Sequence, residues 1–141
     1  MIDNNGIKKF YTLYRADFQN GTTAGWVAKT SGQGYADKIE LIFGMDANAE
    51  NVTGIFILDQ KETPGLGNKI SEDSWRSQFN NKSTRTPFNV VKQGKGGVNE
   101  IDAISGATIS SNAVTKLVNQ AIAHLKPQVA KLKDSDGKGD K

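Results

Sequence analysis

A chain of 141 residues, with 36% hydrophobic and 23% charged residues, is long enough to bury the core of one globular domain. The formal net charge is +3, and no basic stripe carries interleaved aromatic residues, so nothing favours nucleic-acid binding. The absence of cysteine excludes disulfide partners, thiolate catalysis and iron–sulfur clusters on this chain. The single histidine excludes a multi-histidine metal site, and no metal ligand is assigned.

The composition changes at both ends of the chain. Residues 1–9 are polar, and we expect a flexible N-terminal segment there. We interpret residues 10–126 as a single domain and residues 127–141 as a polar C-terminal tail, whose end from residue 134 onward should be disordered. No apolar run reaches the roughly 20 residues that cross a bilayer, and no signal peptide follows Met1.

The first half of the domain has the pattern of an antiparallel meander. Aromatic and β-branched residues gather in four segments, which predicts strands at residues 10–18, 25–30, 38–43 and 52–58. Turn residues separate these segments, at Asn20-Gly21 and at residues 31–34 and 46–51. Connections this short favour antiparallel pairing of consecutive strands.

A loop, a helix and two short strands are predicted next. Pro64 and Gly65 predict a type II turn within the Glu62–Gly67 segment. Residues 71–80 predict a helix with Ser71 as its N-cap, and Trp75 and Phe79 on its buried face. Residues 88–93 and 98–101 are predicted to form a hairpin around a turn at residues 94–97.

The last element is a strongly amphipathic helix. Its apolar residues recur at the spacing of one helical face, at Val114, Leu117, Val118, Ala121, Ile122 and Leu125. We expect Ser110 or Ser111 to cap this helix and Pro127 to break or kink it. The elements together predict an α+β fold, with a twisted, mostly antiparallel sheet and helices packed against it.

The segment from Asp102 to Thr108 places small residues and two hydroxyls directly before this helix. Free N–H groups and the positive end of the helix dipole favour a phosphate there, and Gly106 leaves room for a ligand. We expect Thr108 to lie just before the cap. Nothing nearby activates its hydroxyl, so modification of Thr108 needs a separate enzyme. The alternative is an ordinary helix cap.

Two motifs carry a resemblance to a known family. Every position of the signal Asp-x-x-Ser-Gly-Ala-Thr is present, at Asp102, Ser105, Gly106, Ala107 and Thr108. The Glu62–Gly67 segment matches a second signature of the same family, and the two motifs stand in the family's order. Over roughly residues 10–126 the chain resembles the extracytoplasmic FMN-binding domain of the G subunit of the Rnf electron transport complex. It is also similar to the C subunit of the Na⁺-translocating NADH:quinone reductase.

The resemblance implies that Thr108 carries FMN covalently, through a phosphoester made by an ApbE-like flavin transferase. It implies that the transferase recognises the whole signal, Asp102, Ser105, Gly106, Ala107 and Thr108. It implies that the phosphate is surrounded by Ser105, Gly106 and Ala107. It also implies that the isoalloxazine ring lies beside Glu62, Thr63, Gly65 and Leu66.

The function implied is that of an electron-transfer flavoprotein subunit of a membrane-bound, ion-translocating ferredoxin:NAD⁺ oxidoreductase. Such a domain has the other subunits of the complex as partners, no substrate turnover of its own and no catalytic residue. The resemblance places it at the extracytoplasmic face of the membrane, and we expect the family's N-terminal membrane anchor to be absent from this sequence. Two alternatives stay open: the quinone reductase subunit, and a non-redox module that binds a phosphate-bearing ligand reversibly.

Overall fold

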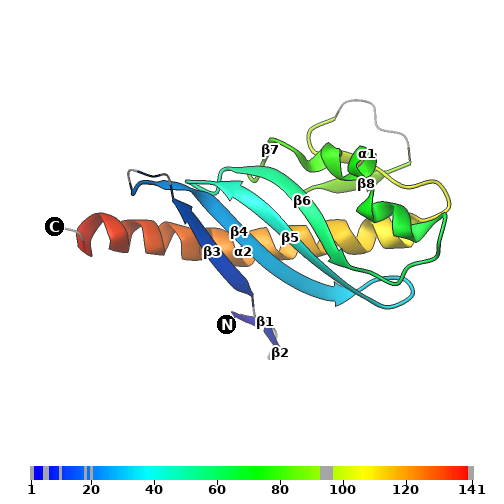
Figure 1. Ribbon diagram of the computed structural model, residues 1–141, viewed down its shortest axis with the longest axis horizontal. Coiled ribbons are helices and arrows are strands. Elements are labelled where there is room, and N and C mark those ends of the chain that lie inside the picture. The colour runs from blue at the N-terminus through cyan, green and yellow to red at the C-terminus, as the bar shows by residue number, and fades with distance from the viewer. Residues whose placement is uncertain are drawn as a thin grey trace.

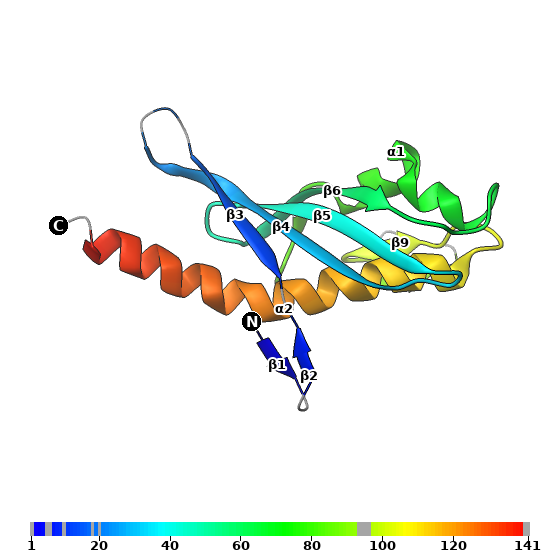
Figure 2. The ribbon, with the colours of Figure 1, turned by 60° about the horizontal axis from the view of Figure 1, so that its bottom comes forward.

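A five-stranded sheet and one long helix form the two main layers of the computed structural model, which describes residues 2–4, 7–9, 11–17, 19, 21–92 and 97–139. Each strand is antiparallel to its neighbour. Their order in the sheet is β3 (Thr12–Asp17), β4 (Thr23–Gln33), β5 (Lys38–Asp46), β6 (Asn51–Asp59) and β7 (Lys82–Ser83). Helix α2 (Thr108–Gly139) lies behind the sheet in Figure 1 and below it in Figure 2. The predicted α+β architecture is confirmed.

The core lies between the inner face of the sheet and α2. Side chains of β5 alternate between buried and partly exposed, as expected for a strand with one covered face. The α2 residues on the predicted apolar face are all buried. A Cβ atom added at Gly32 of β4 would lie 2.5 Å from Leu117 Cδ2, so the helix packs directly onto the strand backbone. This contact fixes where α2 lies relative to the sheet.

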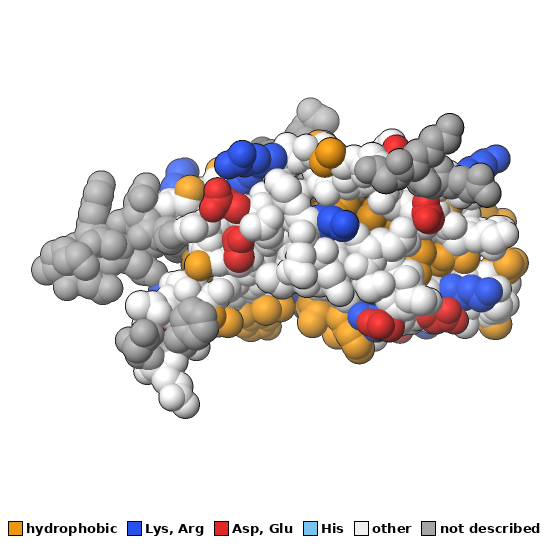
Figure 3. Space-filling view, turned by 90° about the horizontal axis from the view of Figure 1, so that it is seen from above, with side chains coloured by type: hydrophobic (Ala, Val, Ile, Leu, Met, Phe, Trp, Pro, Cys, Tyr) orange, Lys and Arg blue, Asp and Glu red, His pale blue; other side chains and the backbone are white. Residues whose placement is uncertain are grey.

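The outer face of the sheet keeps some apolar surface. Tyr14 on β3, and Phe56 and Leu58 on β6, are exposed large hydrophobic residues. Figure 3, which looks down on the molecule from the top of Figure 1, shows hydrophobic side chains gathered along its lower edge, and basic and acidic side chains interspersed over the rest of the surface in view. The long helix therefore covers only one side of the sheet.

A second, smaller helical layer packs on β6. The single helix predicted for residues 71–80 is wrong: the structure has η1 (Gly67–Ser71), α1 (Asp73–Arg76) and η2 (Ser77–Phe79), with Glu72 in extended conformation. Ile70, Trp75 and Phe79 are all buried, and a spacing of five and then four residues cannot place them on one face of a regular α-helix. Ser71 does not cap α1, whose N-cap residue is Glu72.

Aromatic rings hold this layer in place. The ring centroids of Trp75 and Phe79 are 5.5 Å apart, and those of Phe79 and Phe88 are 4.8 Å apart. Arg76 adds a hydrogen bond from Nη1 to the carbonyl oxygen of Ile55 on β6, at 2.9 Å. The prediction that Trp75 and Phe79 belong to the core is confirmed.

The hairpin predicted for residues 88–93 and 98–101 is also wrong. Strands β8 (Asn89–Val91) and β9 (Glu100–Asp102) pair in parallel, in a separate two-stranded sheet. The predicted turn lies mostly at residues 94–96, outside the described residues. Asn99 redirects the chain: its φ is +54°, and its side-chain amide donates to the carbonyl oxygens of Ser83 and Thr86.

Both ends of the chain differ from expectation. Helix α2 continues through Pro127 to Gly139, although a break or kink at Pro127 and disorder from residue 134 onward were predicted. Leu125 and Val129 are buried on either side of Pro127, and this burial opposes the cost of about 3 kcal/mol for an internal proline. In the segment expected to be flexible, β1 (Ile2–Asn4) pairs antiparallel with β2 (Ile7–Lys9).

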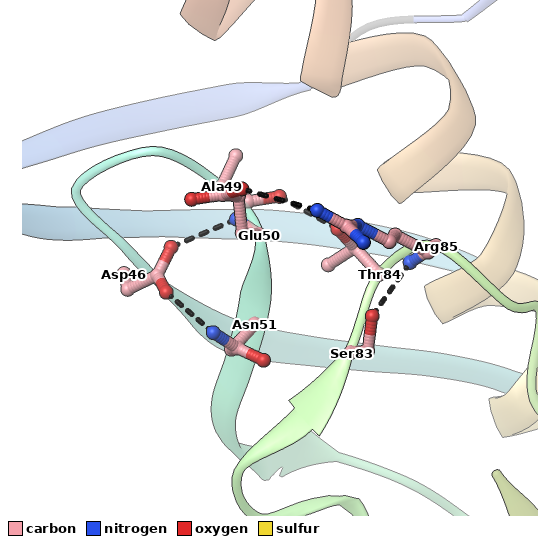
Figure 4. Close-up of polar contacts among 7 residues, drawn as sticks. All are labelled: Asp46, Ala49, Glu50, Asn51, Ser83, Thr84 and Arg85. Carbon is pink, nitrogen blue, oxygen red and sulfur yellow. Dashed lines mark hydrogen bonds and ion pairs between the residues drawn. The ribbon is translucent and has the colours of Figure 1, made fainter. Parts of the chain in front are cut away.

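Polar contacts join the β5–β6 turn to the chain that follows β7 (Figure 4). Asp46 accepts hydrogen bonds from the Glu50 N–H and the Asn51 side-chain amide, both at 2.8 Å. The Thr84 hydroxyl donates to the Ala49 carbonyl oxygen at 2.7 Å. Burial raises the pKa of Asp46, but the hydrogen bonds that its carboxylate accepts from Glu50 and Asn51 outweigh burial and leave the pKa below its ordinary value.

Within the described parts of the chain, no helix combines the length and apolar character needed to span a membrane.

Phe79→Ala should destabilise the fold strongly, because Phe79 is 0% exposed and contacts two other aromatic rings. We expect the free energy of unfolding to fall by about 3–5 kcal/mol in urea denaturation. Leu58→Ala is the control, since Leu58 is 44% exposed and its truncation should cost less than about 1 kcal/mol. Equal losses for the two variants would contradict this description of the core.

Candidate functional site

A cleft of about 450 Å³ opens between three segments of the chain, whose ribbons lie at the right-hand end of Figure 1. They are the β4–β5 turn, the loop after β6 and the first turn of α2. The residues that line the cleft are Tyr35, Thr63, Leu66, Gly67, Gly106, Ala107, Thr108, Ile109 and Ser110. Both motifs singled out in the sequence therefore contribute to one cavity.

Thr108 is the first residue of α2, whereas the sequence predicted that it lies just before the helix cap. The Ser111 N–H donates to the Ala107 carbonyl oxygen at 3.1 Å, so the N–H groups of residues 108–110 lie before the first helical hydrogen bond. Thr108 is exposed at this end of the helix and lines the cleft. Helix N-termini of this kind bind anions through their free N–H groups and dipole.

Ser110 and Ser111 do not cap α2, because both side chains are buried and bonded elsewhere. The Ser111 hydroxyl donates to the Ala107 carbonyl oxygen at 2.9 Å and accepts from the Ile104 N–H at 3.0 Å. The Ala107 N–H donates to the Ile104 carbonyl oxygen at 2.9 Å, which closes a turn with Gly106 at φ +77°. Ser111 thus fixes the loop that enters the helix.

The loop after β6 contains the predicted type II turn. The Leu66 N–H donates to the Thr63 carbonyl oxygen at 3.0 Å, and Gly65 has the positive φ, +78°, that such a turn requires. The Gly65 N–H also donates to the Asn68 side-chain oxygen at 2.9 Å. Gly65 itself is not among the residues that line the cleft, although it sets the direction of Leu66.

The loop after β6 packs closely against the segment that leads into α2. A Cβ atom added at Gly67 would lie 2.5 Å from Ser110 Oγ and 2.8 Å from Glu62 Cβ. A Cβ atom added at Gly106 would lie 3.0 Å from Leu66 Cδ2. Gly67 is therefore needed for the approach of the loop after β6 to the start of α2, whereas Gly106 is favoured by its φ of +77°.

Glu62 joins all three segments from behind the cleft. The residue is only 4% exposed, and its carboxylate accepts four hydrogen bonds. The Ser110 hydroxyl and the Tyr35 N–H donate to Oε1 at 2.6 and 2.8 Å, and the N–H groups of Ala36 and Asp37 donate to Oε2 at 2.9 and 3.3 Å. Burial raises the pKa of Glu62, but the Ser110 and backbone hydrogen bonds outweigh it and leave the pKa below its ordinary value.

The site residues predicted from the sequence do not all line the cleft. Thr63, Leu66, Gly106, Ala107 and Thr108 line the cleft. Glu62 lies behind it, and Asp102 and Ser105 line a separate depression on the other side of the loop.

Sequence reasoning missed three residues of the lining: Tyr35, Gly67 and Ile109. Gly67 and Tyr35 had a signal, since Gly67 closes the Glu62–Gly67 segment and an aromatic residue in a polar turn is unusual. Ser110, which the sequence singled out at the start of the helix, also lines the cleft. Ile109 had no signal, because only the tertiary contacts show which side of α2 faces the cleft.

The rim of the cleft is apolar. Tyr35, Leu66 and Ile109 are large hydrophobic residues that are 62%, 41% and 58% exposed. Exposed apolar side chains around a cavity mark a surface that a ligand or partner covers. An apolar rim beside a helix N-terminus is typical of one class of protein: a small-molecule-binding domain whose ligand carries an anionic group. Among the described residues, no cluster of acidic and histidine side chains could hold a metal ion.

This chain belongs to the family of FMN-binding domains, whose model matches residues 34–123. It is 45% identical over 105 residues to the G subunit of the Na⁺-translocating ferredoxin:NAD⁺ oxidoreductase complex of Acetobacterium woodii, a match that covers 73% of this chain and 50% of that protein. It is 36% identical over 118 residues to the G subunit of the proton-translocating ferredoxin:NAD⁺ oxidoreductase complex of Clostridium ljungdahlii, a match that covers 84% of this chain and 60% of that protein. The chain thus spans only about half to three fifths of the length of these relatives.

Solved structures share the fold. The crystal structure of NqrC from Shewanella oneidensis superposes with a TM-score of 0.75 at 20% identity, over 84% of this chain and 60% of that chain. The C subunit of the Na⁺-translocating NADH-quinone reductase from Parabacteroides distasonis superposes with a TM-score of 0.67 at 27% identity, over 82% of this chain and 61% of that chain.

The residues of the cleft fit FMN. Its volume lies within the range of about 300–1,000 Å³ typical of small-molecule pockets. The apolar rim suits a flat ring system, and the first turn of α2 suits a phosphate. The buried carboxylate of Glu62 lies behind the cleft and not in its lining, and its oxygens accept four hydrogen bonds from the protein.

Glu62→Gln should destabilise the fold and the cleft, because the amide N–H₂ must point at backbone N–H groups that now donate to a carboxylate. We expect a loss of about 3 kcal/mol in the free energy of unfolding, measured in urea. The control Ser110→Ala removes one of the four hydrogen bonds and should cost about 1–2 kcal/mol. A loss for Glu62→Gln no larger than for the control would contradict the role of this carboxylate.

Acid should weaken the same contact. The folded-state pKa of Glu62 lies below its ordinary value of 4.5, so ionised Glu62 stabilises the fold above that value. The contribution is lost as the pH falls through the folded-state pKa. We expect the stability of the natural chain to fall more steeply than that of Glu62→Gln as the pH falls below 4.5, in urea titrations. Asp46 titrates in both proteins and cancels in the comparison, so parallel curves would refute the prediction.

Proposed function

We propose that this chain is an electron-transfer domain that carries FMN covalently, through a phosphoester to Thr108. The observation that carries the proposal is the position of Thr108: an exposed hydroxyl on the first residue of α2, at the wall of the cleft. A phosphate on this hydroxyl can accept hydrogen bonds from the N–H groups of the same helical turn. When bound, FMN supplies the reversible electron chemistry, and the protein supplies position and electrostatics.

The cleft residues have distinct roles in this proposal. Gly106 and Ala107 let the backbone approach the phosphate, and Thr63 and Leu66 lie on the wall that would contact the isoalloxazine ring. Gly65 acts through the turn that orients Leu66. Glu62 acts by holding the three segments together.

Attachment requires a second enzyme, the flavin transferase. Of the described residues that line the cleft, only Tyr35 has an ionisable side chain, and no carboxylate or imidazole there can deprotonate Thr108. In the transfer, Thr108 Oγ1 forms a bond to the phosphorus of an activated flavin nucleotide and loses its proton. The P–O bond to the leaving group of that nucleotide breaks, and its oxygen departs with the leaving group.

The complex we propose is of the Rnf type, with this chain corresponding to the FMN-binding part of the G subunit. The support is the identity of 45% to a G subunit, against 33% over 95 residues to the C subunit of the quinone reductase of Vibrio anguillarum. The domain would relay electrons between ferredoxin and NAD⁺ together with the other subunits. It would lie at the extracytoplasmic face of the membrane. The quinone reductase subunit is the second candidate, supported by the shared fold.

Covalent attachment is tested by intact mass. After co-expression with a flavin transferase, we expect a mass increase of one FMN less one water and a yellow colour that survives denaturation. Thr108→Ala should abolish both. The matched control, Thr53→Ala, removes an exposed hydroxyl on β6 and should be modified fully.

Each outcome separates the candidates. A colourless chain of unmodified mass, under conditions in which a known substrate of the transferase is modified, would overturn the covalent proposal. Colour that is lost on denaturation would instead support the reversible binding module.

A further inference from the structure

The segment from Asp102 to Thr108, called the attachment loop below, has two sides. Gly106, Ala107 and Thr108 line the flavin cleft, whereas residues 102–105 line a separate depression of about 420 Å³. The far wall of this depression comes from the small helical layer: Lys69, Glu72, Ser74, Trp75 and Gln78. Asp102 and Ser105, the first two fixed positions of the attachment signal, are exposed on this side and are not among the residues that line the cleft.

Gln78 holds the backbone of Asp102 at two points. The Asp102 N–H donates to Gln78 Oε1 at 2.7 Å, and Gln78 Nε2 donates to the Asp102 carbonyl oxygen at 3.2 Å. The indole Nε1 of Trp75 donates to the same carbonyl oxygen at 2.9 Å. The side-chain amide thus pairs with Asp102 as a neighbouring strand would, and the start of the loop is fixed to the small helical layer.

This arrangement limits how an enzyme that recognises the signal can approach the loop. An enzyme that contacts Asp102 and Ser105 while it reacts at Thr108 has to reach both sides of the same loop. Its footprint then covers the depression, including the exposed charge of Glu72 and that of Lys69 beside it. The cleft stays open meanwhile to receive the flavin ring.

We propose that this depression is the docking surface for the flavin transferase, and that Gln78 is a positioning residue for the attachment reaction. The inference rests on the proposed function, because it presupposes that Thr108 is the acceptor. Lys69 and Glu72 form a rim of opposite charges, which can match charges on the enzyme and select this chain among other proteins.

The test is the steady-state rate of flavin transfer to the folded chain by purified transferase, with an activated flavin nucleotide as donor. Lys69→Glu and Glu72→Lys should each raise the KM for the chain about tenfold, with kcat nearly unchanged. Lys131→Glu is the matched control, an exposed charge reversal far along α2, and should leave KM unchanged. Gln78→Ala should lower kcat/KM about tenfold, because the loop loses its fixed position.

The outcomes distinguish this inference from the proposed function. Failure to modify even the natural chain at Thr108 would overturn both. Full modification of the natural chain, with KM for the variants at residues 69 and 72 equal to that of the control, would overturn the docking surface alone. Urea denaturation of each variant identifies a loss of folding. The charge reversals do not depend on the hydrogen bonds of Gln78, so they test the surface even if Gln78→Ala is unstable.

Discussion

The buried carboxylate of Glu62 is the contact on which the geometry of the site depends. It joins three segments that are far apart in the sequence: the turn at residues 35–37, the loop after β6 and the first turn of α2. A buried carboxylate is costly unless its oxygens are saturated with donors, and here four donors meet that need. Because a hydrogen-bonded charge tolerates little displacement, the three walls of the cleft are held in one arrangement.

Glycine makes this convergence sterically feasible. Gly67 lies where any side chain would collide with Ser110 and Glu62, and Gly106 lies against Leu66. The loop after β6 can therefore touch the start of α2, and the rim residues Leu66 and Ile109 border the same opening. Packing in the core supports this arrangement, since α2 rests directly on β4 at Gly32.

The loop from residue 102 to residue 108 presents different groups on its two sides. One side presents Thr108, with the N–H groups of a helix N-terminus, to the cleft. The other side presents Asp102 and Ser105 beside a small helical layer that holds the loop through Gln78 and Trp75. The proposed attachment of FMN by a separate enzyme would use both sides: a place for the cofactor, and an accessible surface that does not overlap it.

The sequence by itself predicted much of the framework. Aromatic and β-branched residues gathered at residues 38–43 and 52–58 identified the central strands, the spacing from Val114 to Leu125 identified the long helix, and Pro64-Gly65 identified the type II turn. These signals are local, since period, turn chemistry and apolar spacing depend on residues within a few positions of one another. The two motifs also indicated the cleft, because their own residues form most of its lining.

Only the tertiary structure decided the rest. The parallel pairing of β8 and β9 depends on hydrogen bonds from Asn99 to distant carbonyl oxygens, and the three short helices depend on burying Ile70, Trp75 and Phe79 together. The position of Glu62 behind the cleft, and of Asp102 outside it, depends on partners up to 48 residues away. Local patterns determine which elements form. Contacts between segments distant in the sequence determine which side chains line the cleft, because burial and hydrogen-bond partners exist only once the segments have met.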